Sequence, residues 1–253
     1  MDLNLTGKRV FISGSTRGIG FGIASQFVNA GANVILNSRS SKQIAEVVET
    51  LNACGGVTGD VTSPSVATSV IEEAALICGG GLDTVICNVG SGSSVAPGAE
   101  TYEEWERVFA LNFFSAINVI SASSKFLKES RGSIVCISSI CGCETIVGAP
   151  VTYSVAKSAL NTYVNAIARP FGNDGIRINS IAPGNINFEG SVWSERLRDN
   201  PGSVETMLSN EVPLGRLGSP SDVANLALWL SSDAAKFVTG SIFRTDGGQT
   251  RNS

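Results

Sequence analysis

The chain of 253 residues contains no histidine. Histidine is the commonest general base and the commonest metal ligand in enzymes, so its absence excludes every Ser-His-Asp triad. Proton transfer is left to tyrosine, lysine, aspartate, glutamate or cysteine. Among six cysteines only Cys141 and Cys143 lie close together, and this C-x-C pair without histidine does not match a zinc site. We therefore expect no bound metal, and free thiols in a reducing cytosol.

Long apolar runs are also missing, since no stretch approaches the roughly 18–20 residues that a membrane span requires. The first residues, Met1–Arg9, lack the charged-then-apolar pattern of a signal peptide. The net charge of −4 argues against nucleic acid or an anionic membrane as partner. Hydrophobic residues make up 43% of the chain, which indicates a well-filled core. We expect a cytoplasmic protein that acts on a small molecule.

What is present is a regular alternation of strand-like and helix-like segments. Strands are predicted at Val10–Ser13, Asn33–Asn37, Val57–Gly59, Thr84–Cys87, Ser133–Ser138, Arg177–Ile181 and Ser241–Arg244. Helices are predicted at Ile19–Ala30, Lys42–Asn52, Ser65–Cys78, Thr101–Leu127, Thr152–Phe171 and Ser221–Ser231. This alternation predicts an α/β fold with one domain over residues 1–253. About seven parallel strands would form a doubly wound, Rossmann-type sheet with helices on both faces.

Two segments read as loops. Val89–Ala99 is rich in Gly and Ser and follows the carboxyl end of a strand, where ligands bind in such sheets. The stretch 185–220 reads as one long irregular region, which predicts a substrate loop or lid. Within it, Phe188, Val192 and Trp193 would form an apolar lid over the substrate. Arg196 and Arg198 either meet an anionic group of the substrate or lie on an exposed helical face, and we favour the exposed face.

Tyr153 and Lys157 stand four residues apart, so on a helix they lie on one face. A nearby ammonium group favours the phenolate and lowers the pKa of a tyrosine from about 10. Such a tyrosine exchanges a proton with a carbonyl or alcohol oxygen. The alternative is a half-buried tyrosine beside a surface lysine, and the pair alone does not decide between them.

The first strand runs into Gly14-x-x-x-Gly18-x-Gly20, which opens a helix. Glycines here permit a tight turn and let backbone N–H groups approach a pyrophosphate at the helix N-terminus. With this spacing, the chain resembles the short-chain dehydrogenase/reductase family, and in particular its 3-oxoacyl-[acyl-carrier-protein] reductase-like members. Further motifs of that family follow in order over nearly the whole chain: Asp60-Val61, Asn88-Val89-Gly90, Asn112, Ser138-Ser139, Tyr153 with Lys157, Pro183-Gly184 and Asp246-Gly247-Gly248.

The resemblance implies specific roles for these residues. Tyr153 would donate a proton to a substrate carbonyl, Ser139 would polarise that carbonyl, Lys157 would bind the nicotinamide ribose, and Asn112 would hold a relay water. The implied cofactor site comprises Gly14, Ser15, Thr16, Arg17, Gly18, Ile19, Gly20, Ser38, Arg39, Asp60, Val61, Asn88, Val89, Gly90, Tyr153, Lys157, Pro183, Gly184 and Ile186. Ser139, Phe188 and Trp193 would contact the substrate.

The chain departs from the family pattern at two places. Ser139 lies 14 residues before Tyr153, where the family usually has 13. The family often has a threonine five residues beyond the proline of Pro183-Gly184 that binds the nicotinamide amide, and Phe188 stands there instead. The backbone of Ile186, or Asn187, would have to hold the amide.

The end of the second strand bears on the choice of cofactor. An NAD site places an acid there, but this chain has Asn37, Ser38 and Arg39. Arg39 can pair with a 2′-phosphate, and Arg17 adds a second charge. Although both arginines would also be ordinary as solvated loop residues, we expect NADP(H) rather than NAD(H).

We therefore expect an NADPH-dependent oxidoreductase, a carbonyl reductase acting on a ketone, 3-oxoacyl or sugar-like substrate. One alternative is an alcohol or sugar dehydrogenase that runs oxidatively, because the same residues serve both directions. An alternative of another class is a non-catalytic dinucleotide sensor. Family members are commonly homotetramers or homodimers, and we expect the same assembly here.

Overall fold

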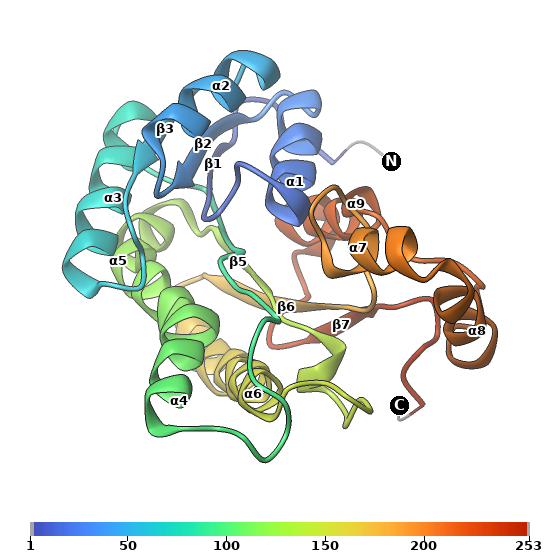
Figure 1. Cartoon of the computed structure of the whole chain (residues 1–253). Helices are drawn as coiled ribbons and strands as arrows, with labels where there is room; N and C mark the ends of the chain where they lie inside the picture. Colours follow the sequence, from blue (N-terminus) through green and yellow to red (C-terminus); the bar gives the residue numbers. More distant parts are fainter. Residues whose placement is uncertain (1–2, 252–253) are drawn as a thin grey trace.

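Seven parallel strands form one sheet in the computed structural model, which describes residues 3–251 (Figure 1). The first two and last two residues of the predicted domain lie outside the described residues. The strands are β1 (Arg9–Ile12), β2 (Asn33–Ser38), β3 (Gly55–Thr58), β4 (Thr84–Cys87), β5 (Ser133–Ile137), β6 (Arg177–Pro183) and β7 (Ile242–Thr245). Their order across the sheet is β3-β2-β1-β4-β5-β6-β7. The predicted doubly wound parallel sheet is thus confirmed.

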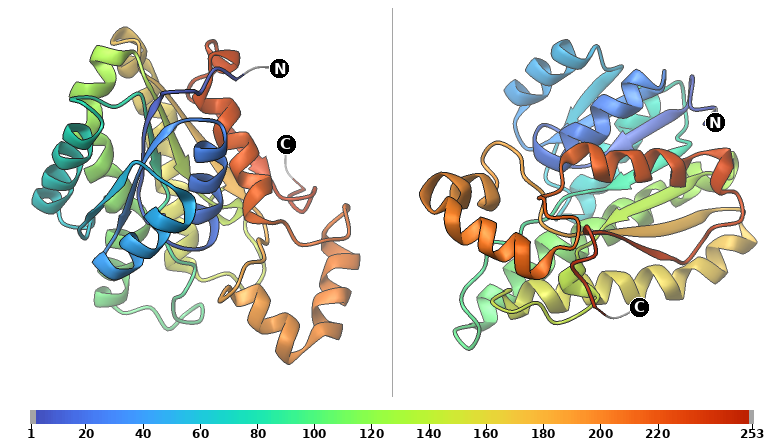
Figure 2. Two further views of the ribbon diagram at one scale, coloured as in Figure 1. Left: turned by 90° about the horizontal axis from the view of Figure 1, so that it is seen from above. Right: turned by 90° about the vertical axis from the view of Figure 1, so that its right-hand side faces the viewer.

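Helices cover both faces of the sheet. One face carries α1 (Gly18–Asn29), α2 (Ser41–Leu51) and α9 (Pro220–Ser231), and α1 lies beside α9 (Figure 2). The other face carries α3 (Pro64–Ile77), α5 (Ser115–Ser130) and α6 (Val151–Asn173). A strand covered on both sides must be apolar on both, which is why the central strands read as continuous hydrophobic runs.

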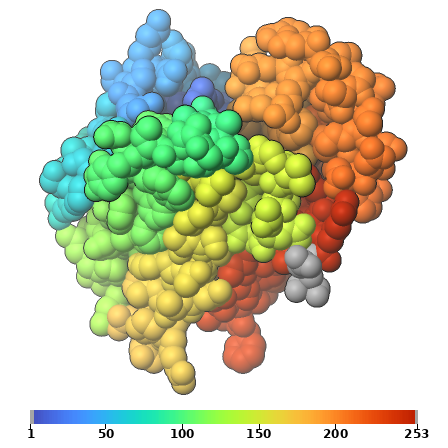
Figure 3. All heavy atoms as spheres, turned by 60° about the horizontal axis from the view of Figure 1, so that its bottom comes forward, coloured from blue at the N-terminus to red at the C-terminus, as the bar shows by residue number. Residues whose placement is uncertain are grey.

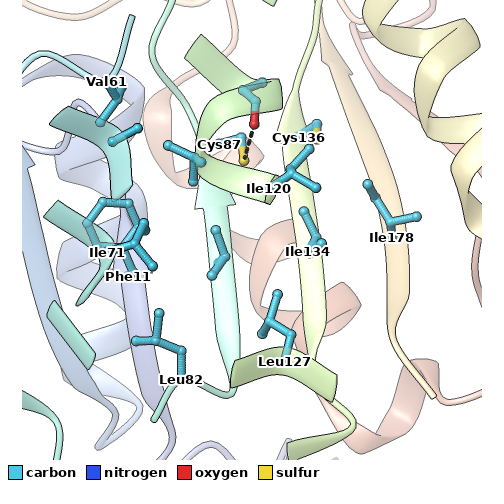
Figure 4. Packing of buried hydrophobic residues seen from close by; sticks show 14 of the residues in the cluster. Phe11, Val61, Ile71, Leu82, Cys87, Ile120, Leu127, Ile134, Cys136 and Ile178 are labelled. Carbon is cyan, nitrogen blue, oxygen red and sulfur yellow. Dashed lines mark hydrogen bonds between the residues drawn. The ribbon is translucent and has the colours of Figure 1, made fainter. Parts of the chain in front are cut away.

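Successive side chains of a strand enter the two cores alternately. In β1, Phe11 belongs to the core under α3 and α5, whereas Val10 and Ile12 belong to the core under α1 and α9. All three side chains are fully buried. The first core also holds Cys87 and Cys136 of neighbouring strands β4 and β5 (Figure 4). All six cysteines of the chain are free thiols.

The predicted helical stretch Thr101–Leu127 is confirmed, but it is not a regular α-helix throughout. It is divided into α4 (Tyr102–Phe109), a π-helical turn η1 (Ala110–Phe114) and α5. In the π-turn the N–H of Ser115 donates to the carbonyl of Ala110, five residues earlier. The extra residue per turn shifts the phase of the helix at this point, and such turns often mark functional sites.

The prediction that residues 185–220 are irregular was wrong. The segment contains α7 (Val192–Asp199) and α8 (Pro201–Glu211). Ser191 caps α7 by accepting the N–H of Ser194 at 3.0 Å, and Asn200 caps α8 by accepting that of Ser203 at 3.2 Å. Ser and Asn also occur in turns, but here they are helix caps, and α8 in addition has Pro201 at its first helical position. No helix within residues 3–251 is both long and apolar enough to cross a membrane.

Candidate active site

The predicted site residues gather at the carboxyl edge of the sheet. Strands β1 and β4 are neighbours, although the chain winds away from them in opposite directions, so a crevice opens where these strands end. The glycine loop leaves β1 at this point. The loop after β4, the segment after β5 and the α7–α8 segment also reach one face of the molecule, where they are green, yellow-green and orange (Figure 3).

The three glycines of the loop meet two different requirements. Gly14 and Gly18 have φ of +62° and +56°, in the left-handed region that favours glycine. At Gly20 a Cβ would lie 2.3 Å from the Gly14 carbonyl oxygen and 2.5 Å from the Asn88 amide nitrogen. Only glycine lets α1 approach the loop this closely, so the motif is a structural requirement at all three positions.

Buried polar residues fix the loop to its neighbours. Ser15 exchanges main-chain and side-chain hydrogen bonds with the backbone of Asn37 at the end of β2. Asn88 donates its side-chain amide to the carbonyls of Ser13 and Gly14 at 3.1 and 2.9 Å. Asn88 could be selected from its motif. The roles of Ser13 and Asn37 could not be predicted, because their partners are remote in sequence.

The N-terminus of α1 has no capping side chain: its N-cap residue, Arg17, accepts no hydrogen bond there with its side chain. The starts of α2 and α4, in contrast, are capped by Ser40 and Thr101. The first N–H groups of α1, from Gly18 onward, therefore carry the partial positive charge of a helix end without an internal acceptor. This is the arrangement that binds a phosphate.

Strand β2 ends at Ser38, and Arg39 follows it directly. The Gln43 carboxamide oxygen lies 3.5 Å from both the Thr16 and Ser38 hydroxyls, a partner that sequence reading did not identify. Arg39 Nη1 lies 3.9 Å from an oxygen of Asp60, with side chains 78% and 45% exposed. An acid from the end of β3 thus reaches Arg39 even though β2 supplies none. An exposed pair of this kind contributes about 0–1 kcal/mol, so Arg39 stays free to turn to another anion.

Val61, expected with Asp60 near an adenine ring, is 2% exposed and lies in the core. Its side chain is therefore turned away from solvent. The carbonyls of Val61 and Thr62 both accept from the Asn118 amide, which fixes the chain beyond β3 to α5.

Asn112 lies in the π-turn and is 1% exposed. Its amide nitrogen donates to the carbonyl of Val108 at 3.1 Å, and its amide oxygen accepts the N–H of Ser91 at 2.9 Å. A Cβ at Gly90 would lie 2.9 Å from that oxygen and 3.1 Å from Lys157 Nζ. Asn112, Gly90 and Lys157 therefore meet at one point beyond β4.

Lys157 is 3% exposed and donates from Nζ to the carbonyl of Ile137 at 2.8 Å. Burial lowers the pKa of this lysine to about 8, and the thiols of Cys136 and Cys87 oppose the shift only partly. A cation in so dry a place is costly unless it is paired. The alternative of a surface lysine beside Tyr153 is excluded by this burial.

Tyr153 lies beside Lys157, whose Nζ is 5.9 Å from the centre of its ring. Burial raises the pKa of Tyr153 to about 12, and a hydrogen bond with Ser139 opposes the rise. The expected lowering of this pKa by Lys157 is thus wrong for the protein alone, because desolvation of the phenolate outweighs the distant ammonium. The hydroxyl is a phenol at neutral pH and can donate its proton.

Ser139 lies two residues beyond the end of β5, is 7% exposed and accepts the N–H of Cys141 at 3.2 Å. The extra residue before Tyr153 falls in a segment whose tip is a surface turn closed by the N–H of Ala149 and the carbonyl of Ile146, with Val147 99% exposed. The contact between Ser139 and Tyr153 is therefore kept. Ser138, in contrast, hydrogen-bonds the Lys157 carbonyl at 3.3 Å and serves the scaffold.

The loop after β4 is held against the start of α6. The Ser94 hydroxyl lies 2.6 Å from both the Glu104 carboxylate and the Thr152 hydroxyl. Arg107 binds Glu104 through two nitrogens at 2.7 Å, and together with Ser94 it lowers the pKa of that carboxyl to about 2. Because Thr152 precedes Tyr153, this network positions one wall of the crevice relative to the tyrosine.

The α7–α8 segment departs from the predicted lid in one respect. Phe188 does not project to solvent: its ring lies on the glycine loop, where a Cβ at Gly18 would be 2.7 Å from Cε2 of the ring. Trp193 lies on α7 with the Arg196 guanidinium 4.9 Å from its ring. Arg198 pairs with Asp199 at 2.9 Å, so these arginines occupy an exposed helical face, the alternative that we favoured.

The remaining predicted residues complete the edge. Pro183 is buried at the end of β6, and Gly184 lies against the backbone of Asp246. Ile186 is 5% exposed and forms a parallel bridge with Gly218. Within residues 3–251, no three His, Cys, Asp or Glu side chains gather in a way that could hold a metal ion.

Comparison with known proteins places this chain among oxidoreductases. The profile of a family described as enoyl-(acyl carrier protein) reductase matches residues 14–250. An uncharacterised oxidoreductase of Methylorubrum extorquens is 35% identical over 249 residues, which cover 96% of this chain and 98% of that protein. A 3-oxoacyl-[acyl-carrier-protein] reductase of Aquifex aeolicus is 31% identical over 255 residues, covering 98% and 99%. The structure of L-sorbose reductase from Gluconobacter frateurii complexed with NADPH and L-sorbose superposes with a TM-score of 0.93 at 28% identity, covering 100% of both chains.

Proposed function

Because this chain belongs to the short-chain dehydrogenase/reductase family of oxidoreductases, we propose that it is an NADPH-dependent carbonyl reductase. Its substrate would be a small ketone, a 3-oxoacyl thioester or a ketose. One observation carries the proposal: a buried lysine, a neutral tyrosine, a serine and a buried asparagine meet beside a phosphate-binding glycine loop. The names of the relatives, a 3-oxoacyl reductase and a sorbose reductase, support the substrate classes.

A nicotinamide dinucleotide fits the residues that are present. The uncapped start of α1 supplies N–H donors for the diphosphate. The parallel bridge at Ile186 uses the Asn185 carbonyl and the Asn187 N–H, both on Gly218. In an extended chain the N–H and C=O of Ile186 itself then point to the opposite side, which supports the idea that its backbone holds the nicotinamide amide in place of a threonine.

The preference for NADPH over NADH belongs to the proposal. Arg39 is exposed, and within the described residues it is paired only weakly, with Asp60. Ser38, Thr16 and Gln43 surround the same corner and add hydrogen-bonding groups. A 2′-phosphate would draw Arg39 away from Asp60, because a charge-assisted bond to phosphate is stronger than an exposed pair at 3.9 Å.

In the proposed reduction, the cofactor and four residues each have a separate role. Bound NADPH supplies the hydride. Tyr153 donates its phenolic proton to the substrate oxygen, with Ser139 as a second hydrogen-bond partner for that oxygen. Lys157, with a pKa of about 8, is mostly charged at neutral pH and stabilises the phenolate that forms. Asn112 accepts the N–H of Ser91 with its amide oxygen and so fixes the backbone beside Lys157.

The raised pKa of Tyr153 agrees with the proton-donor role that the proposed reduction assigns to it. At neutral pH the phenol holds its proton, as a proton donor must, whereas oxidation of an alcohol needs the phenolate as base. The expected homotetramer or homodimer and the cytoplasmic location stay predictions.

The test compares Tyr153→Phe with the parent by following NADPH oxidation against cyclic ketones, ketoses and 3-oxoacyl thioesters. We expect kcat to fall by about 10²-fold or more, with NADPH affinity kept. Tyr163→Phe is the matched control, because Tyr163 lies on the same helix with its ring against Phe113 and outside the site. Near-full activity of Tyr153→Phe would contradict the mechanism. NADPH binding without turnover of any substrate by the parent would favour the sensor.

A further inference from the structure

The Phe188 ring lies against the glycine loop, at a place that the diphosphate of a bound cofactor would need. A Cβ built on Gly18 would lie 2.7, 2.8 and 3.1 Å from three carbons of the Phe188 ring. No other group comes as near to that position, so the ring covers the face of Gly18 from which a side chain would project. The contact joins residues 170 positions apart in sequence, and neither residue predicts it alone.

That face is the approach route of the diphosphate. The middle glycine of a dinucleotide loop has no side chain so that the pyrophosphate can come close to its backbone. Gly18 also begins α1, whose first N–H groups lack a side-chain cap. The Phe188 ring and a bound diphosphate therefore compete for the same surface.

The ring is held in place by its backbone and by apolar contacts. The Phe188 N–H donates to the Ser191 hydroxyl at 3.2 Å, and its carbonyl accepts the N–H of Ser191 at 2.9 Å. The preceding Asn187 is tied through its N–H to Gly218 at 2.8 Å. The ring packs with Ile19 against the core under α1 and α9. When the Phe188 ring moves away from Gly18, mainly by rotation of its side chain, apolar surface becomes exposed.

We propose that Phe188 limits the affinity of the dinucleotide site, because its ring covers Gly18 and has to move away for the diphosphate to bind. The proposal rests on the proposed function, since it concerns the same cofactor. Binding must displace the ring, so Phe188 weakens the affinity for NADPH and NADH alike. It should leave unchanged the recognition of the adenosine end, which the proposed function assigns to Arg39 at the end of β2.

The experiment measures dissociation constants by titration calorimetry for the parent, Phe188→Ala and Phe188→Leu. We expect Phe188→Ala to bind NADPH and NADH about tenfold more tightly, a change of about 1.4 kcal/mol. Phe188→Leu, which keeps apolar bulk, should lie between. The control Phe237→Ala truncates a fully exposed phenylalanine that follows α9, outside the site, and should match the parent. Thermal unfolding of each variant checks that the variant is folded.

Adenosine 2′-phosphate, which lacks the diphosphate, is the second probe. Its affinity should be the same in the parent and in Phe188→Ala if the ring competes only with the diphosphate. Unchanged or weaker NADPH binding by Phe188→Ala, with the parent binding normally, would overturn this inference and leave the proposed function intact. If neither protein bound a dinucleotide, the proposed function would fall and this inference with it.

Discussion

Replacing Lys157 by methionine should make the protein more stable at neutral pH. The lysine is 3% exposed, and burial lowers its pKa from 10.5 to about 8. Each unit of pKa difference corresponds to about 1.36 kcal/mol, so the charged lysine costs about 3 kcal/mol of folding free energy at pH 7. Methionine removes this cost at similar volume, but it also loses the hydrogen bond to Ile137, worth about 1 kcal/mol. The expected net gain is about 2 kcal/mol.

The pH dependence gives the sharper test. Because the folded-state pKa is depressed, the unfolded chain binds the proton more tightly, and the cost is fully present below pH 8. It diminishes as pH rises towards 10.5, so the parent gains stability relative to the variant. Between pH 7 and pH 9.5 the difference should change by about 2 kcal/mol. Staying below pH 10 avoids the titration of Tyr153, whose raised pKa acts in the opposite direction.

Urea unfolding of the parent and of Lys157→Met at both pH values measures this difference, since groups common to both proteins cancel. Parallel pH dependences would refute the reasoning, because they would mean that Lys157 has the same pKa folded and unfolded. The gain in stability should come with loss of reductase activity, a cost expected where an active site holds a buried charge.

Two further predictions concern the cofactor site. Arg39→Asp should shift the ratio of kcat/KM for NADPH over NADH towards NADH, and an unchanged ratio would show that Arg39 does not contact the 2′-phosphate. Gly20→Ala should lower the free energy of unfolding by about 1–3 kcal/mol, because its Cβ would meet the Gly14 carbonyl at 2.3 Å. Denaturant unfolding checks this, and dinucleotide affinity should fall with it as the loop shifts. A fully stable Gly20→Ala protein would contradict the packing described.

The sheet could be predicted from the sequence because strands buried on both sides leave long apolar runs. The four residues that we propose to be catalytic, Asn112, Ser139, Tyr153 and Lys157, could be selected from the sequence because each belongs to a motif in a fixed order. The helices α7 and α8 were missed because they are short, and because Ser191 and Asn200 look the same as caps and as turn residues. The spacing of residues alone does not distinguish a helix cap from a turn residue.

Burial was the second quantity that the sequence did not supply. Residue spacing placed Lys157 beside Tyr153 but could not tell how far each is withdrawn from water, so the pKa of Tyr153 was expected in the wrong direction. The same limit applies to Asn37 and Ser13, which bind backbone groups 20 or more residues away. Phe188 was recognised as a departure, but its place on Gly18 depends on the bridge between Ile186 and Gly218.

The π-turn at Ala110–Phe114 makes the position of Asn112 depend on the length of the chain as well as on its residue types. Each α-helical residue turns the chain by about 100°, so the single surplus residue sets the relative rotation of α4 and α5. Removing one residue other than Asn112 between Trp105 and Val119 would restore a regular helix without changing any of the four proposed catalytic residues. Asn112 would then turn away from Gly90, or the whole of α5 would turn away from the sheet. In this protein, a one-residue deletion would disable the site as surely as replacing its tyrosine.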